Sequence, residues 1–163
     1  MKLTYGELVA SANNIITGEP GPFTRFRAVA KPFNTASRVR DIARQFEVKF
    51  KDFIEERDGL FERHAKKSED GTIWEFANDD DREAFNAAHR LLLRTVIEIP
   101  GERIEPRHLL SSTVIADADL ELLDWLIDDG VTERVDPVDP TDLDEQFADD
   151  LLELEENAEA AAA

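Results

Sequence analysis

Residues 39 to 64, VRDIARQFEVKFKDFIEERDGLFERH, decide the fold because apolar side chains recur along them at alternating intervals of four and three. This spacing is typical of an α-helix that packs along its length against another helix. Gly59 weakens such a helix by roughly 1 kcal/mol without breaking it. We predict a long helix here and take Phe46, Phe50 and Phe53 as candidate partner-binding residues. The recurring positions, of which six are apolar, are Val39, Ala43, Phe46, Phe50, Phe53, Arg57, Leu60 and His64.

The long helix is preceded by a basic segment that begins at Phe23. Pro32 interrupts this segment, because proline has no amide proton and clashes with the carbonyl group four residues earlier. The helix must therefore kink or restart there, and Asn34 or Thr35 can cap a restart. The architecture that we predict keeps one long helix, kinked near Pro32.

The N-terminus predicts a shorter helix. Thr4-Tyr5-Gly6-Glu7 has the pattern of a capping box, in which the side chains of Thr and Glu each bond to the backbone of the other. Apolar residues then recur at helical spacing from Leu8 onward. Residues 17–22, TGEPGP, are rich in helix breakers and should end the helix. We interpret these residues as a plain connector.

Two short stretches rich in β-branched and aromatic residues, 72–76 and 95–99, flank a second helix. That helix follows the acidic run 79–81, whose carboxylates interact favourably with the positive end of a helix dipole. We predict that it folds back on the long helix as an antiparallel hairpin. The two β-prone stretches should pair with each other as a two-stranded ribbon at the base of this hairpin.

Between Pro100 and Gly130 the sequence predicts two smaller helical elements. Residues 106–110 have the composition of a short helical turn. Asp117 can cap a further helix, whose apolar face then continues as far as Ile127. Together with the hairpin, these elements predict a mainly α fold with a small two-stranded β element.

The composition changes after Gly130, and we divide the chain into a helical body, residues 1–130, and an acidic arm, residues 131–163. The composition of residues 136–140, DPVDP, predicts an extended linker. Thr141 can cap a last helix, and its apolar face supplies further candidate partner-binding residues. Those residues are Leu143, Phe147, Leu151 and Leu154.

The net charge of −18 is distributed unevenly. Residues 109–163 carry 18 acidic side chains and a single basic one, whereas residues 1–108 carry 18 basic and 19 acidic side chains. Within the first part, residues 23–67 hold 12 basic and 7 acidic side chains. The acidic third of the chain repels free nucleic acid and attracts a basic partner or the protein's own basic helix. We therefore do not expect direct binding of nucleic acid.

The composition of the acidic arm is compatible with three interpretations. It can be a disordered tail that keeps the protein in solution. It can contain a short amphipathic helix that docks into a groove. It can also imitate the charge of a nucleic acid towards a protein that binds one.

The sequence contains no pattern that indicates catalysis. There is no Cys, which excludes disulfides, zinc knuckles and thiol nucleophiles from this chain. The glycines do not form a phosphate-binding loop, and the three histidines, His64, His89 and His108, are far apart in sequence. The acidic run 79–81 lacks the spacing of a calcium loop. We expect a protein without enzymatic activity, cofactor or bound metal. No apolar stretch is long enough for a membrane span and no signal peptide is visible.

Several segments of the sequence together form a recognisable pattern. They are Met1 to Leu8 (MKLTYGEL), Phe53 to Leu60 (FIEERDGL), His64 to Lys67, Glu69 to Gly71, Phe85-Asn86, Val96 to Ile99 and Asp117 to Leu120. These segments resemble a family of small, uncharacterised proteins of tailed bacteriophages that is classified as a domain of unknown function. The resemblance extends over roughly residues 1–127, and the chain departs from it at Pro32 and in the acidic arm. It implies a phage origin and a small helical accessory protein, with no established activity and no catalytic residues.

These observations favour a phage accessory protein that binds other proteins, in virion or tail assembly. The alternative is an acidic inhibitor of a host nucleic-acid-binding or defence protein. Either function requires a phage or host protein as partner and places the chain in the host cytoplasm or in the virion. The length of the apolar stripe also allows self-association.

Overall fold

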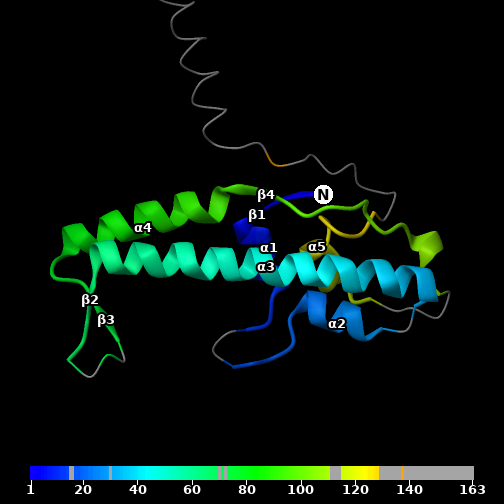
Figure 1. Ribbon diagram of the computed structural model, residues 1–163, viewed down its shortest axis with the longest axis horizontal. Helices are drawn as coiled ribbons and strands as arrows, with labels where there is room; N and C mark the ends of the chain where they lie inside the picture. Colours follow the sequence, from blue (N-terminus) through cyan, green and yellow to red (C-terminus); the bar gives the residue numbers. More distant parts are fainter. Residues whose placement is uncertain are drawn as a thin grey trace, which may run out of the picture.

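The computed structural model describes residues 1–14, 17–29, 31–69, 71, 73–110, 115–128 and 137. Within these ranges the protein is mainly helical, as predicted, and the long helix α3 (Phe33–His64) runs along most of the body (Figure 1). The four predicted anchor residues of the acidic arm, Leu143, Phe147, Leu151 and Leu154, lie outside the described residues.

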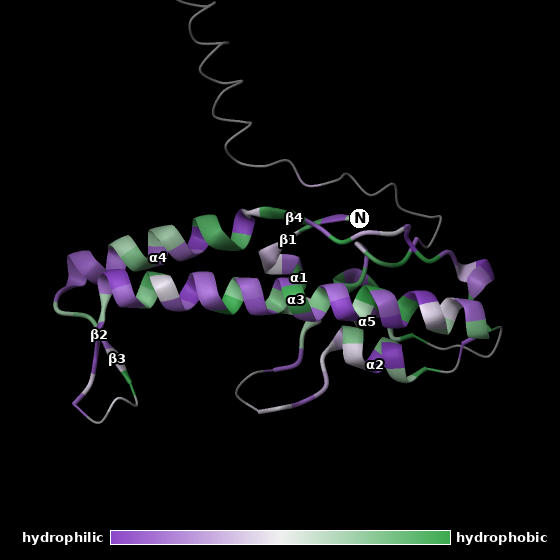
Figure 2. Ribbon diagram, in the orientation of Figure 1, coloured by the Kyte–Doolittle hydropathy of each residue, from purple (hydrophilic) through white to green (hydrophobic). Residues whose placement is uncertain are grey.

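Helices α3 and α4 (Asp79–Arg94) form the predicted antiparallel hairpin (Figure 1). The side chain of Asn78 caps α4 by accepting a hydrogen bond from the backbone N–H of Asp81 at 2.8 Å. Hydrophilic and hydrophobic residues alternate along both helices (Figure 2), which is typical of amphipathic helices. The predicted stripe is confirmed, since the buried residues of α3 include Val39, Ala43, Phe46, Phe53 and Leu60.

Pro32 separates two helices, so the predicted restart occurs and the kinked single helix is wrong. The basic segment forms a helix of its own, α2 (Pro22–Ala28), and Pro32 directly precedes α3. The carbonyl group of Pro32 accepts the first helical hydrogen bond, from the N–H of Ala36 at 2.9 Å. A proline fits this position because its missing N–H has no partner at a helix start anyway.

The two predicted caps, Asn34 and Thr35, lie inside α3 and cap nothing. Thr35 is buried, and its hydroxyl group donates a hydrogen bond to the carbonyl oxygen of His108 at 2.6 Å. His108 ends the short 3₁₀ turn Pro106–His108, which confirms the helical turn predicted there. Thr35 thus fastens that turn to the first part of the long helix.

The predicted ribbon between residues 72–76 and 95–99 is wrong. Strand β3 (Trp74–Glu75) pairs with β2 (Lys66–Lys67), and β4 (Val96–Glu98) pairs with the N-terminal strand β1 (Lys2–Thr4). Both pairs are antiparallel, and each forms a two-stranded sheet. The physical reason is the length of α4, because its 16 residues span about 24 Å and hold the two stretches at opposite ends of the helix.

The capping box is confirmed at the start of α1 (Tyr5–Ser11). The backbone N–H of Glu7 donates to the Thr4 side chain at 3.2 Å, and the Glu7 carboxylate accepts from the backbone N–H of Thr4 at 2.7 Å. The helix ends at Ser11, and its buried side holds Tyr5, Leu8 and Ser11. The chain therefore enters the loop towards α2 earlier than the apolar spacing predicts.

The predicted C-terminal helix of the body is shorter than expected. Helix α5 covers Asp117–Leu122 and is preceded by Ala116, so Asp117 lies inside the helix and the predicted cap is wrong. Trp125, which follows in a turn, is 1% exposed and is one of the largest fully buried side chains of the described protein. Where the structure describes helices, none is both long and apolar enough to span a bilayer.

Candidate functional site

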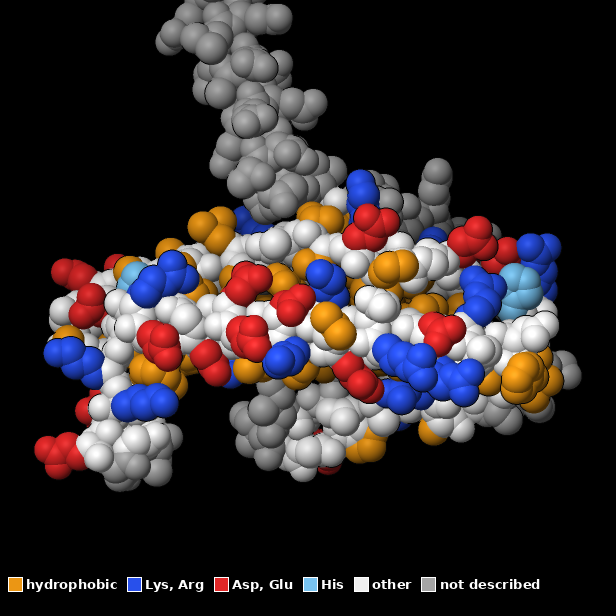
Figure 3. Space-filling view, viewed as in Figure 1, with side chains coloured by type: hydrophobic (Ala, Val, Ile, Leu, Met, Phe, Trp, Pro, Cys, Tyr) orange, Lys and Arg blue, Asp and Glu red, His pale blue; other side chains and the backbone are white. Residues whose placement is uncertain are grey.

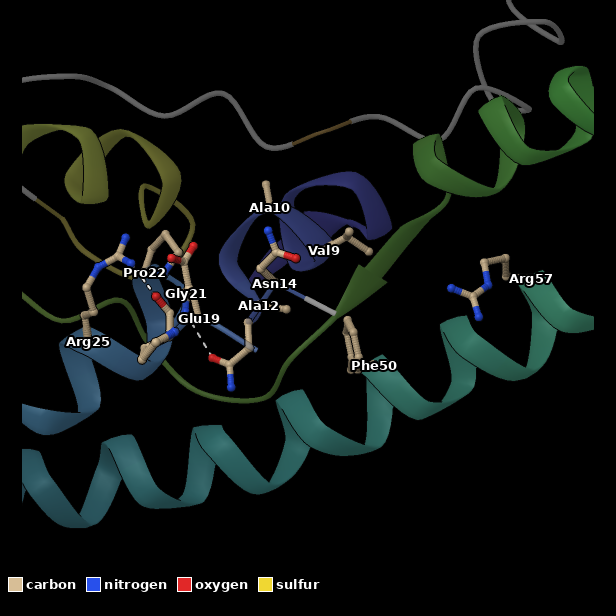
Figure 4. A pocket seen from close by; sticks show the side chains of 12 residues that line it. Val9, Ala10, Ala12, Asn14, Glu19, Gly21, Pro22, Arg25, Phe50 and Arg57 are labelled. Carbon is tan, nitrogen blue, oxygen red and sulfur yellow. Dashed lines mark hydrogen bonds between the residues drawn. The ribbon is translucent and has the colours of Figure 1, made fainter. Parts of the chain in front are cut away.

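A cleft opens where α1, the loop after it and α2 meet the side of α3 (Figure 4). It consists of two hollows of about 560 and 290 Å³, which share Ala12, Asn13 and Phe50 as lining residues. In the larger hollow Arg25 lies near one end and Arg57 near the other, with Phe50 between them (Figure 4). Phe50 and Arg57 are seven residues apart on α3, or about 10 Å, so the cleft follows the helix. We call the two joined hollows the cleft.

The loop that walls the cleft is shaped by the side chain of Asn13. Its Oδ1 atom accepts hydrogen bonds from the backbone N–H of Gly21 at 3.0 Å and from the hydroxyl group of Thr24 at 2.6 Å. Asn14 closes the tip of the loop by accepting a hydrogen bond from the N–H of Thr17 at 3.0 Å. Two consecutive asparagines therefore hold the loop against the start of α2.

Gly21 allows this loop to approach the end of α1. A Cβ atom at Gly21 would lie 1.9 Å from the carbonyl oxygen of Ala12, a distance that no side chain tolerates. The next residue, Pro22, is buried and begins α2. The glycine and proline at the end of the predicted connector thus form one wall of the cleft.

Three phenylalanines were predicted to bind a partner, and the structure places them differently. Phe46 and Phe53 are buried in the protein's own core, whereas Phe50 is half-buried and lines both hollows. The Phe50 ring is 6.4 Å from the ring of Phe46 and 6.3 Å from that of Phe53. Phe50 is therefore the one of the three that a partner can reach most fully.

Arginine side chains line the cleft, and each is held by a carboxylate. Arg25 forms a two-pronged contact with Asp119 of α5, in which the Nε–Oδ2 distance is 2.9 Å. This hydrogen bond is the main reason why the pKa of Asp119 lies below its usual value. Arg27 approaches Glu47 to 3.4 Å and so joins α2 to α3.

The cleft borders a basic surface made by α2 and the first part of α3. Residues 22–51 contain 8 basic and 2 acidic side chains. Figure 3 shows Lys and Arg side chains gathered over this part of the body. A segment that enters the cleft therefore meets the ring of Phe50 and the side chains of three arginines, Arg25, Arg27 and Arg57. The carboxylates of Glu19 and Glu47 also line the cleft.

The end of the described body is fixed directly beside the cleft. The indole N–H of Trp125 donates a hydrogen bond to the hydroxyl oxygen of Ser11 at 2.9 Å, and both residues are buried. The Ser11 oxygen also lies 2.8 Å from the carbonyl oxygens of Glu7 and Leu122, so its single proton donates to one of them at a time.

The Trp125 ring in turn packs against two rings that line the smaller hollow. It lies 5.8 Å from the ring of Phe23 and 6.0 Å from that of Phe46. Aromatic pairs at such distances contribute about 0.5–1.5 kcal/mol beyond the burial of their area. The continuous described chain therefore ends at Asp128, three residues after a side chain that packs beside the cleft.

Within the described residues, no group of three or more His, Asp or Glu side chains could hold a metal ion. His89 instead stacks on Phe85, with ring centroids 5.6 Å apart, and lies 6.3 Å from the ring of Phe53. Burial, followed by the charge of Arg57, lowers the pKa of His89. These surroundings give His89 a packing role, and the absence of enzymatic activity stays a prediction.

Among the predicted partner-binding residues, only Phe46 and Phe50 line the described cleft, and sequence reasoning missed the other residues that build it. The pair Asn13-Asn14 directly before a Gly- and Pro-rich loop is a signal that could have indicated side-chain bonding within the loop. Nothing in the local sequence pairs Arg25 with Asp119 or Ser11 with Trp125, since these partners are 94 and 114 residues apart.

Comparison with known proteins gives no relative on which to base a function, because no protein-family model, no curated protein and no solved structure matches this chain.

Proposed function

We propose that this chain is a non-enzymatic accessory protein of a tailed bacteriophage, and that it binds an acidic, amphipathic segment of another protein in the cleft. The observation that carries the proposal is the half-buried ring of Phe50 between Arg25 and Arg57 (Figure 4). An apolar residue of a partner covers the ring, while its carboxylates face the basic surface of α2 and α3. The phage origin and a role in virion or tail assembly rest on the sequence resemblance alone.

The cleft is suited to a peptide in particular. Interfaces of helices in grooves rely on a few apolar anchors, with charged side chains at the rim that select the partner. Each arginine that lines the cleft is already paired with a carboxylate of this chain. A carboxylate of the partner therefore either shares an arginine with that carboxylate or displaces it. Charge selects an acidic segment, and the ring provides the apolar contact.

The test is a pull-down of the tagged full-length chain from cells infected with its phage, run in parallel with two variants. Phe50→Ala removes the ring from the cleft, and Phe61→Ala removes a half-buried ring of the same helix that lies in neither hollow. Phage structural proteins should be recovered by the parent and by Phe61→Ala but lost with Phe50→Ala. Equal recovery by both variants, or recovery of no phage protein by the parent, contradicts the proposal.

A second candidate function is inhibition of a basic host protein through the acidic arm. It is supported by the composition of residues 131–163, which carry 12 acidic side chains and one basic side chain. In the same experiment this function predicts a basic host protein whose recovery is indifferent to Phe50→Ala and falls as salt is raised. Recovery that persists after the acidic residues of the arm are replaced by Asn and Gln would exclude it.

A further inference from the structure

We infer that the cleft is occupied by a segment of the protein's own acidic arm, residues 141–156, which a partner segment must displace. This inference rests on the proposed function, because it takes the cleft to be the surface that receives an acidic amphipathic segment. Three observations carry it: the chemistry of the arm, the charge around the cleft and the place where the described body ends.

The arm has the chemistry that the cleft selects. Residues 141–156, TDLDEQFADDLLELEE, contain 8 acidic side chains and no basic one. The apolar residues recur at intervals of four, four and three, which places them on one face of a helix. They are Leu143, Phe147, Leu151 and Leu154. An apolar face for Phe50 and a carboxylate face for the basic surface are thus present in one short segment.

The excess of basic side chains in α2 and the first part of α3 favours this part of the body as the docking place, although the lining itself holds three arginines and two glutamates, Glu19 and Glu47. Residues 22–51 carry 8 basic against 2 acidic side chains, whereas residues 109–163 carry a single basic side chain against 18 acidic ones. The basic part and the acidic part of the chain can therefore attract each other within one molecule. Attraction between them acts over about 8 Å at physiological ionic strength.

The attachment point makes the contact easy to reach. Trp125 packs on Phe23 and Phe46, which line the smaller hollow. The dozen residues between Asp128 and Thr141 have a root-mean-square span of about 20 Å as a flexible chain and reach about 40 Å when extended. A tether of this length gives an effective concentration in the millimolar range, so even a contact of millimolar affinity is formed in a large fraction of molecules.

The test uses the full-length chain, in which the absence of Cys allows a single spin label to be placed cleanly. Ala148→Cys puts a nitroxide on the arm beside its apolar face. Paramagnetic broadening of backbone amide signals should be strong for Asn13, Thr24 and Phe50 of the cleft and weak for Glu75 in the distant β2–β3 ribbon. Raising the salt from 0.01 to 1 M should reduce the broadening, because the Debye length falls from about 30 to about 3 Å.

The matched control carries the same label but has Ser at the four apolar positions of the arm, which leaves its length and charge unchanged. Broadening in the cleft should fall at least several-fold in this control, to the level of the ribbon. Equal broadening in the two labelled chains, or none in the cleft of the parent, overturns the inference. In a further control, an isotope-labelled chain without nitroxide is mixed with a spin-labelled chain that is not isotope-enriched. Broadening of the cleft signals in this mixture assigns the contact to a second copy of the chain, which likewise overturns the inference.

The two proposals fail separately. If the arm broadens the cleft signals but Phe50→Ala still recovers the same phage proteins, the proposed function is wrong and the arm contact stands. If the arm leaves the cleft signals unchanged while Phe50→Ala abolishes recovery, the cleft binds a partner without competition from the arm.

Discussion

Ser11→Ala removes one hydroxyl group from the buried junction between α1 and Trp125, and we expect it to destabilise the fold by about 1–3 kcal/mol. Ser11 is 0% exposed and Trp125 is 1% exposed. The variant leaves the indole N–H without the acceptor that now lies 2.9 Å away, and it also leaves the carbonyl oxygen of Leu122 without that hydroxyl group. Alanine is close to serine in volume, so a cavity adds little to this free energy.

A double-mutant cycle isolates the hydrogen bond from the packing of the ring. Trp125→Phe removes the N–H together with part of the ring that packs against Phe23 and Phe46. When Ser11→Ala is combined with it, no unpaired N–H remains. The double variant should therefore be less destabilised than the sum of the two single variants, by about 1 kcal/mol or more.

The assay is urea unfolding followed by far-ultraviolet circular dichroism, which reports on the helices and does not depend on the tryptophans being exchanged. Each kcal/mol should also lower the melting temperature by about 2–4 °C. The reasoning is refuted if Ser11→Ala unfolds within about 0.5 kcal/mol of the parent, or if the two single free energies simply add in the double variant.

Further predictions concern the glycines and two titrating groups. Gly59→Ala should raise the free energy of unfolding by about 0.5–1 kcal/mol, because a Cβ in this part of α3 meets no atom within 4 Å beyond the neighbouring helix backbone. Gly21→Ala should instead lower the free energy of unfolding, because the new Cβ would lie 1.9 Å from a backbone carbonyl oxygen. Urea unfolding measures the change in both variants. Changes of the same sign in Gly59→Ala and Gly21→Ala would contradict the cleft geometry. Burial and a nearby carboxylate raise the pKa of Tyr5, the single tyrosine, to about 12. The contribution of the neutral Tyr5 side chain to the free energy of unfolding should therefore be complete below pH 10 and lost as the pH rises through 12. A midpoint near pH 10 in the phenolate absorbance of the folded protein would contradict this. Arg25→Gln should raise the pKa of Asp119 towards its ordinary value. The difference in free energy of unfolding between the parent and Arg25→Gln should be largest above pH 4 and should shrink as the pH falls through the lowered pKa of Asp119. Urea unfolding at pH 7 and at pH 3 measures this difference. An equal difference at the two pH values would contradict the ion pair.

The elements that could be predicted are those whose signal is local. The capping box of Thr4 and Glu7 needs only four residues, and the stripe of α3 repeats often enough for its period to be clear. The hairpin of α3 and α4 follows from two amphipathic helices that bury their apolar faces against each other, joined by residues 65–78. Each of these features was confirmed because neighbouring residues are sufficient to specify it.

The strand pairing could not be obtained in this way. Strands β1 and β4 have three residues each and lie more than ninety residues apart, and Leu3 pairs with Ile97. Residues 72–76 and 95–99 are both rich in β-branched or aromatic residues, and this composition gives no information on which strand each one joins. The decision is made by the length of α4, which separates them, and by the N-terminal strand that is free to reach the end of that helix.

The cleft was missed for a related reason, because its walls come from contacts between distant parts of the chain. The side chain of Asn13 bonds to Gly21, eight positions further along the chain, and Arg25 is positioned by Asp119, which is 94 positions away. Composition marked the loop only as a set of helix breakers. Phe50 was singled out as part of an apolar stripe, but its partial exposure depends on how α1 and α2 pack against α3.

The most direct test of the central claim, that the cleft is the protein-binding surface, is photocrosslinking from the position of Phe50. Benzoylphenylalanine replaces Phe50 in the full-length chain, and the same probe replaces Val48, which is 52% exposed on the same helix, as control. On irradiation of phage-infected cells, the account predicts that position 50 forms adducts with an acidic amphipathic segment, of a phage protein or of the chain's own arm, and that position 48 does not. Adducts of equal yield from both positions, or adducts from position 50 that map to no such segment, would contradict the account.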